Sequence, residues 1–247
     1  MKILALTLEK CSGCAIFVDD KIVFASSEER YSRIKSDSSF PLNSIKEGLE
    51  YSGLRGQDFD KIIICGNKIS LIPSLINEYS TFSLDDQIKS MEEYWYPNLV
   101  LGENKSFLEI FKDKINLNQF PYNTELGQKF EIFKLQNPYT QEDGEKVSNF
   151  FKQIISSLLE TEQEKIIHME HDWCHAAYGF YGSPIREDNT LIVTADAWGD
   201  DLSGTLSLYS KEKNQIDRVK EYNHKDFQLA RIYRYTTLVL RMLANEH

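Results

Sequence analysis

Four short runs of hydrophobic residues in the first 66 positions predict β-strands. Residues 2–8, 14–18 and 21–25 follow one another with only short polar turns between them, which predicts an antiparallel meander. The fourth run, residues 61–66, contains three consecutive isoleucines. We therefore expect a strand that is buried on both faces.

A helix is predicted between the third and fourth runs. Pro41 stands at its start, and Gly53 follows in the position that commonly ends a helix. A second helix is predicted at residues 145–160, where apolar side chains recur on one face, and it leads into a short strand at 165–168. Strands and helices in this order favour an α/β class, with a mixed sheet and helical cover.

Residues 67–144 show no clear period, because aromatic side chains are scattered among charged residues and asparagines. We interpret this segment as an insertion with short helices.

The last part of the chain predicts further strands. The apolar run 191–195 is interpreted as a buried strand that ends at Asp196 and is followed by a turn. Residues 204–209 and 215–221 are predicted hairpin strands, and residues 231–244 a helix. Because no glycine or proline ends that helix, we expect the sequence to be part of a longer protein.

Composition is that of a globular protein and narrows the range of partners. Of 247 residues, 41% are hydrophobic and 27% charged, and the formal charge is −10. An acidic chain without a basic cluster repels a phosphate backbone, so no nucleic acid partner is expected. No apolar stretch reaches the roughly 18–20 residues that span a bilayer, so no membrane partner is expected.

Four cysteines are too few for a disulfide scaffold, and we expect a cytoplasmic protein.

Two histidines are the clearest chemical signal. His171 and His175 lie four residues apart on a predicted helix, so their rings project from one face and can bind one divalent metal ion. Three carboxylates lie within reach of such a site: Glu170, Asp172 and, by its place at a strand end, Asp196. A histidine pair at this spacing also occurs by chance, each ring bonded to a carbonyl group or to solvent. Because two ligands do not make a stable site, metal binding requires a third.

The first turn is a second candidate site. Cys11 and Cys14 have the spacing of a redox dithiol or of half a zinc knuckle. They lie between two predicted strands and not at a helix N-terminus, which argues against a redox pair, and no second close cysteine pair completes a knuckle. The same turn contains Ser12 and Gly13, and backbone N–H groups in such turns often meet a phosphate.

Taken in order, these features resemble the N-terminal domain of the O-carbamoyltransferases that modify nodulation factors and antibiotics, which are similar in turn to the tRNA threonylcarbamoyl transferases. The resemblance rests on the opening strands and on three later groups: the run Glu28-Glu29-Arg30-Tyr31-Ser32-Arg33, the run Glu170-His171 through His175-Ala176-Ala177, and Asp196 with Gly199-Asp200. It covers residues 1–66 and 145–247. By itself the charged run that begins at Glu28 is typical of a solvated exit from a strand.

The resemblance implies an α/β fold of the actin, sugar-kinase and acetate-kinase type, which is ribonuclease H-like. Residues 1–247 would form an incomplete N-terminal domain, the first half of a duplicated fold. The resemblance also implies an enzyme that moves the carbamoyl group of a carbamoyl-adenylate to a hydroxyl of a small acceptor. The adenylate is made from carbamoyl phosphate and ATP by a C-terminal domain beyond this sequence. A homodimer stays open.

The resemblance assigns His171 and His175 to a metal ion, with iron expected first and zinc second. The third ligand in that family is an aspartate much later in the chain. Asp196 and Gly199 are expected against the adenylate. The turn after Asp196 usually begins with glycine, whereas here Ala197 follows.

The resemblance also implies roles near the N-terminus. Glu28 or Glu29 is expected to orient the acceptor, and Arg30, whose planar fork suits phosphate, to anchor an anionic group. Ser12 and Gly13 are expected to contact the cofactor. The family usually has a histidine and an aspartate in this first turn, so the chain departs from it there.

Two alternatives stay open. One is a non-catalytic, nucleotide-binding member of the same fold, and the other is a metal-dependent hydrolase built on the same two histidines. Metal analysis separates the first alternative from the enzymes, and release of pyrophosphate separates a transferase from a hydrolase.

Overall fold

The computed structural model describes residues 1–69, 71–76, 82–129 and 141–223, together with residues 229, 232, 233 and 236. The chain divides into two compact units. The first comprises Met1–Ile64 and Ile69–His168, and the second comprises Cys65–Lys68 and Met169–His247. Each unit has its own hydrophobic core.

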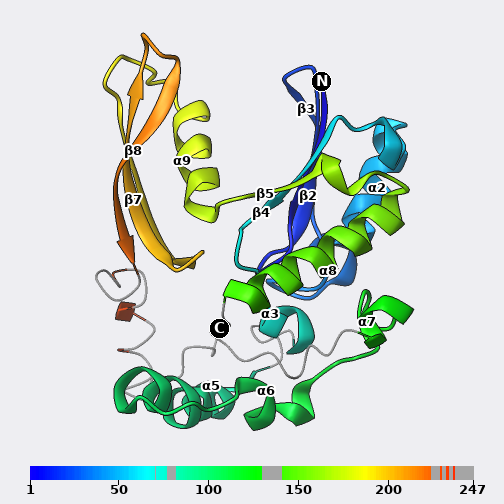
Figure 1. Ribbon diagram of the computed structural model, residues 1–247, viewed down its shortest axis with the longest axis vertical. Helices are drawn as coiled ribbons and strands as arrows, with labels where there is room; N and C mark the ends of the chain where they lie inside the picture. Colours follow the sequence, from blue (N-terminus) through cyan, green and yellow to red (C-terminus); the bar gives the residue numbers. More distant parts are fainter. Residues whose placement is uncertain are drawn as a thin grey trace. The chain divides into compact units, whose positions relative to one another are not determined.

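The first unit is built on a five-stranded sheet in the order β3-β2-β1-β4-β5 (Figure 1). The strands are β1 (Lys2–Thr7), β2 (Gly13–Val18), β3 (Lys21–Ser27), β4 (Lys61–Cys65) and β5 (Ile166–Met169). The first three pair antiparallel, with Leu4 opposite Ile16, so the predicted meander is confirmed.

Strand β4 corrects one expectation. Ile62 and Ile64 are fully buried, whereas Ile63 and Cys65 are partly exposed. The alternation means that one face of the strand packs in the core and the other is only partly covered. The expectation of a strand buried on both faces is therefore wrong for one face.

Helices cover this sheet. Helix α2 (Leu42–Ser52) packs on β2 and β3 and ends at Gly53, whose φ of 67° is left-handed, as the sequence predicted. Helix α8 (Gln141–Leu159) is the predicted amphipathic helix. The unit also contains α1 (Glu29–Ser32), η1 (Gly56–Asp58) and η6 (Gln163–Lys165). Among the described residues, no helix is both long enough and apolar enough to cross a membrane.

Short helices occupy the described part of the predicted insertion. They are α3 (Leu71–Ile76), α5 (Leu84–Ser90), η2 (Met91–Trp95), η3 (Pro97–Leu101), α6 (Phe107–Ile110), η4 (Lys112–Lys114) and α7 (Glu125–Lys129). Tyr94, Phe107 and Phe111 are fully buried and form part of the first unit's core. These three rings pack as a cluster, with centroids 5.0 Å apart for Tyr94 and Phe107 and 4.8 Å apart for Phe107 and Phe111. Tyr96 of the same segment is 52% exposed.

The second unit consists of a helix on an antiparallel three-stranded sheet (Figure 1). The strands are β6 (Leu191–Gly199), β7 (Leu202–Ser210) and β8 (Gln215–Asn223), and the helix is α9 (His171–Tyr181). Ala176 and Phe180 of the helix pack against Ile192, Tyr209 and Ile216 of the sheet.

Strand β6 corrects two further expectations. It continues through Asp196 to Gly199, with an irregular register against β7 in its last part, so the predicted strand end is wrong. Its side chains alternate in burial: Ile192 is buried, whereas Val193 is 61% exposed. An apolar run does not reveal this alternation, because both faces carry hydrophobic side chains. The helix expected at residues 231–244 lies largely outside the described residues.

Candidate metal centre

The start of helix α9 is fixed by a carboxylate. Glu170 caps the helix, and its side chain accepts hydrogen bonds from the backbone N–H groups of Asp172 at 2.7 Å and Trp173 at 3.1 Å. Arg218 of β8 donates to Glu170 at 2.6 Å, and its guanidinium lies over the Trp173 ring at 5.5 Å. The helix that contains both histidines is therefore anchored to the sheet at its first turn.

The two imidazole rings converge. The Nε2 atoms of His171 and His175 are 3.0 Å apart, and the ring centroids are separated by 4.7 Å. The side chain of His175 is 51% exposed and that of His171 only 24%. One nitrogen of each ring thus faces the same point, which is open to solvent on the His175 side.

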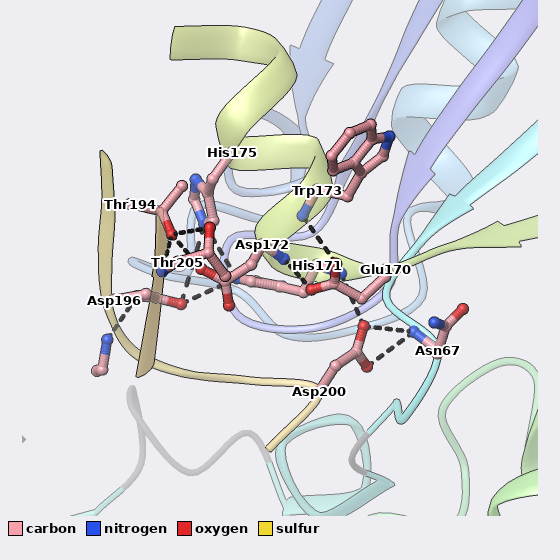
Figure 2. A network of polar contacts seen from close by, with 11 residues as sticks. Asn67, Glu170, His171, Asp172, Trp173, His175, Thr194, Asp196, Asp200 and Thr205 are labelled. Atoms are coloured by element: carbon pink, nitrogen blue, oxygen red, sulfur yellow. Dashed lines mark hydrogen bonds and ion pairs between the residues drawn. The ribbon is translucent and has the colours of Figure 1, made fainter. Parts of the chain in front are cut away.

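A carboxylate of β6 completes a group of three (Figure 2). Oδ2 of Asp196 lies 2.9 Å from Nε2 of His171 and 3.9 Å from Nε2 of His175. The three ligand atoms all lie within 4.8 Å of one another, a spacing that suits one shared metal ion. In the part of the chain that the structure describes, this is the one such group of histidine, cysteine and acidic side chains.

The Asp196 carboxyl is held in its ionised form. Burial raises its pKa, but hydrogen bonds from His171 and from the backbone N–H of Ala197 and the charges of both imidazoles outweigh burial. The pKa therefore lies below its usual value of 3.8. At neutral pH the carboxylate is available as a metal ligand.

The other two nearby carboxylates, Glu170 and Asp172, make hydrogen bonds that stabilise the fold. Glu170 caps α9, as described above. Asp172, the second residue of α9, is fully buried, and its carboxylate accepts a hydrogen bond from the hydroxyl of Thr194 in β6 at 2.6 Å. Thr194 lies 2.8 Å from the Thr205 hydroxyl, which links β6 to β7. Of the three acidic residues that the sequence placed near the histidines, only Asp196 reaches both rings.

The predicted residues Gly199 and Asp200 lie directly against His171. A Cβ atom at Gly199 would stand 2.1 Å from Cδ2 of the His171 ring, so only glycine fits there. The next residue, Asp200, accepts the backbone N–H of His171 at 2.7 Å. The contact of Gly199 with an adenylate stays a prediction.

Ser12 and Gly13 belong to the first unit. Ser12 is fully buried, and its backbone N–H donates to the Asp37 carbonyl at 2.9 Å. A Cβ atom at Gly13 would stand 2.5 Å from the Ser26 carbonyl oxygen, so glycine is needed for the close approach of β3. Both residues have structural contacts, and their cofactor-binding role stays a prediction.

Glu28 and Arg30 differ in exposure. Glu28 is buried, and its carboxylate accepts hydrogen bonds from the backbone N–H groups of Asn43 and Ser44 in the first turn of α2. Arg30 is 70% exposed and lies 3.3 Å from Glu29. Glu28 therefore acts as a cap of α2, while the guanidinium of Arg30 is accessible to a ligand. Their catalytic roles stay predictions.

Two contacts of the site were not foreseen. Arg218 holds the Glu170 cap, and the Asp200 carboxylate contacts the loop of Asn67 and Lys68. These partners are separated by 48 and 133 positions in the chain. The Gly199-Asp200 turn was a visible signal in the sequence, whereas nothing marked Arg218.

Comparison with known proteins agrees with these features. A family model described as carbamoyltransferase N-terminus matches residues 2–246. A search of curated proteins found no significant match. Because the family model spans nearly all of the sequence, the chain belongs to the carbamoyltransferase family and matches its N-terminal region.

Proposed function

We propose that this chain takes part in carbamoyl transfer from a carbamoyl-adenylate to a hydroxyl group of a small acceptor, assisted by a divalent metal ion on His171, His175 and Asp196. Membership of the carbamoyltransferase family supports carbamoyl transfer in general. The convergence of two imidazoles and a carboxylate supports the metal centre, and it is the observation that carries the proposal.

The three groups fit a metal ion. Imidazole nitrogens and carboxylate oxygens bind such ions at about 2.0–2.2 Å, so neighbouring ligand atoms of an octahedral site lie about 3 Å apart. The separations of 2.9 and 3.0 Å around His171 meet this requirement, and the 3.9 Å between His175 and Asp196 needs a small side-chain rotation. Two histidines and one carboxylate are typical of non-haem iron(II) sites, so we propose iron first and zinc second.

We propose for Asp196 a role different from the expected contact with the adenylate. The resemblance placed it against the adenylate and put the third metal ligand much later in the chain. Its ionised carboxylate beside both rings favours Asp196 as the third ligand. With only three protein ligands, a bound ion would stay accessible to substrate, as catalytic sites require.

The transfer step is a substitution at the carbamoyl carbon. The acceptor oxygen forms a bond to that carbon, the bond from the carbon to the adenylate phosphate oxygen breaks, and AMP leaves while the hydroxyl proton passes to a base. A bound ion supplies Lewis-acid polarisation of the carbamoyl carbonyl or of a phosphate oxygen. His171, His175 and Asp196 would hold it, because α9 positions both histidines and β6 positions the carboxylate.

Other parts of the proposal concern the substrates and the fold. Carbamoyl phosphate and ATP are the proposed sources of the adenylate, which a C-terminal domain makes. Arg30 is a candidate anchor for an anionic group because its guanidinium is exposed. The mixed sheet with helical cover is compatible with an actin and sugar-kinase type of fold, which we propose for the whole protein.

The experiment uses the full-length protein with carbamoyl phosphate and ATP. We expect release of pyrophosphate and, when a polyhydroxylated acceptor is added, a product heavier than the acceptor by one carbamoyl group, detected by mass spectrometry. In Asp196→Asn the acceptor product is expected to fall at least tenfold, while release of pyrophosphate by the other domain persists.

The matched control is Asp201→Asn, which removes a carboxylate of the same turn that does not contact the histidines. It is expected to keep the wild-type rate. Consumption of carbamoyl phosphate without pyrophosphate would favour the hydrolase alternative. Equal product from wild type and Asp196→Asn would contradict the proposed centre.

A further inference from the structure

We propose that Asp200 is a positioning residue of the proposed metal centre. Its carboxylate bonds both to the backbone N–H of His171, at the start of α9, and to the loop that follows β4, and these bonds fix the position of His171. This inference rests on the proposed function, because it concerns how the histidine ligand is held. It assigns to Asp200 no contact with metal or substrate.

The Asp200 carboxylate accepts hydrogen bonds from three backbone N–H groups. Figure 2 shows its contacts with Asn67. The N–H of His171 donates to Oδ2 at 2.7 Å. The N–H of Asn67 contacts both oxygens at 2.8 and 2.9 Å, and the N–H of Lys68 donates to Oδ1 at 2.5 Å. One side chain thus joins three segments that are far apart in the sequence.

A carboxylate suits this position for electrostatic reasons. The first N–H groups of a helix have no partner within the helix and carry partial positive charge, so a negative side chain stabilises them. Hydrogen bonds to an ionised acceptor are also stronger than neutral ones. His171 is the first residue of α9, so its N–H is one of these groups.

The backbone and the ring of His171 are both contacted by residues of one short segment, 196–200. Gly199 lies against the ring, Asp200 holds the backbone N–H, and Asp196 accepts from the ring nitrogen. Asp196 and Gly199 belong to the last part of β6, and Asp200 is the first residue after it. A shift of this turn therefore moves the ring of His171 and the carboxylate of Asp196 together.

Asp200 is not itself placed as a ligand. Both of its oxygens accept backbone N–H groups, and it is not a member of the cluster formed by the two histidines and Asp196. A carboxylate that contacts a ligand's backbone and not the ion acts through that ligand. Loss of such partners typically weakens metal affinity about 10–100-fold.

The test compares Asp200→Asn with Asp201→Asn. Asp200 and Asp201 have left-handed φ angles of 52° and 68°, which asparagine tolerates, so neither substitution strains the turn. In the first variant an amide NH2 replaces one acceptor oxygen and faces N–H donors. Asp201 pairs with Lys68 instead, and loss of its charge leaves the contact of Asp200 with His171 in place.

Titration of the full-length protein with Co²⁺ supplies the first measurement. We expect Asp200→Asn to bind about 10–100-fold more weakly, with a changed visible absorption spectrum of the bound ion. Asp201→Asn is expected within twofold of wild type and with the same spectrum. Wild-type affinity and an unaltered spectrum in Asp200→Asn would overturn the inference.

Amide hydrogen exchange of His171, measured without metal, separates this inference from the proposed function. Exchange at His171 is expected to be at least tenfold faster in Asp200→Asn than in wild type and unchanged in Asp201→Asn. Failure of the wild type to bind Co²⁺ would remove the metal centre but leave this comparison intact. Equal exchange in Asp200→Asn and wild type would show that Asp200 does not hold His171.

Discussion

At the scale of single residues, the proposed metal centre depends on how the Asp196 carboxylate of β6 approaches the imidazoles of His171 and His175. His171 and His175 were recognisable from their spacing alone, because four residues on a helix return to the same face. Asp196 was recognisable as a nearby carboxylate but not as the third member of the group. Its place depends on the path of β6 past its predicted end, which the composition of the run does not reveal.

The first prediction concerns the pH dependence of stability. The pKa of Asp196 is lower in the folded protein than its usual value of 3.8, so its contacts stabilise the fold above that value and this contribution is lost as pH falls through the folded pKa. In the metal-free protein, Asp196→Asn is therefore expected to be less stable than wild type at pH 7. Chemical denaturation should show the difference shrinking below about pH 4. A difference of the same size at pH 7 and pH 3 would contradict this assignment.

The second prediction uses two glycines. A Cβ atom at Gly199 would overlap the His171 ring, whereas nothing lies within 4 Å of one at Gly179 in α9. We expect Gly199→Ala to displace the ring and weaken metal binding at least tenfold. Gly179→Ala is expected to leave binding unchanged and to stabilise the helix by up to about 1 kcal/mol. Metal titration and thermal melting measure the two effects, and tight metal binding by Gly199→Ala would contradict the ring packing.

At the scale of elements, the sequence predicted correctly those helices and strands whose formation depends mainly on neighbouring residues. The meander of β1, β2 and β3 follows from alternating hydrophobic runs and short turns, and α2 from a proline start and a glycine end. The burial of a strand depends on what packs on each face, which the strand's own sequence does not contain. For this reason β4 and β6 were both expected to be more deeply buried than they are.

The third prediction concerns helix α2. Glu28 accepts the N–H groups of Asn43 and Ser44, so Glu28→Ala leaves the buried N–H of Ser44 and the partly buried N–H of Asn43 without this acceptor. The substitution is expected to cost about 1–3 kcal/mol of unfolding free energy. Glu47→Ala, at an exposed position of the same helix, is the matched control and is expected within about 0.5 kcal/mol of wild type. Denaturant titration measures both. An unchanged stability in Glu28→Ala, together with lost transfer activity, would instead favour the predicted catalytic role.

At the scale of the whole molecule, the contacts that build the site join distant parts of the chain. Asp200 meets Asn67 across 133 positions, and Arg218 meets Glu170 across 48. Such pairs depend on which segments lie side by side in the folded protein, and the hydrophobic pattern of one segment does not specify its distant neighbours. The α/β class and the family could be predicted from the sequence, because both follow from the order of elements and motifs along the chain. The arrangement around His171 required the structure.

Metal content is the most direct test of the central claim, that His171, His175 and Asp196 share one ion. The full-length protein, its His175→Ala variant and a His168→Ala control outside the cluster are purified without chelator, and bound metals are measured by elemental mass spectrometry. We expect about one iron or zinc per chain in wild type and in His168→Ala, and less than a tenth of that in His175→Ala. Absence of metal from the wild type, or full retention in His175→Ala, would contradict the account.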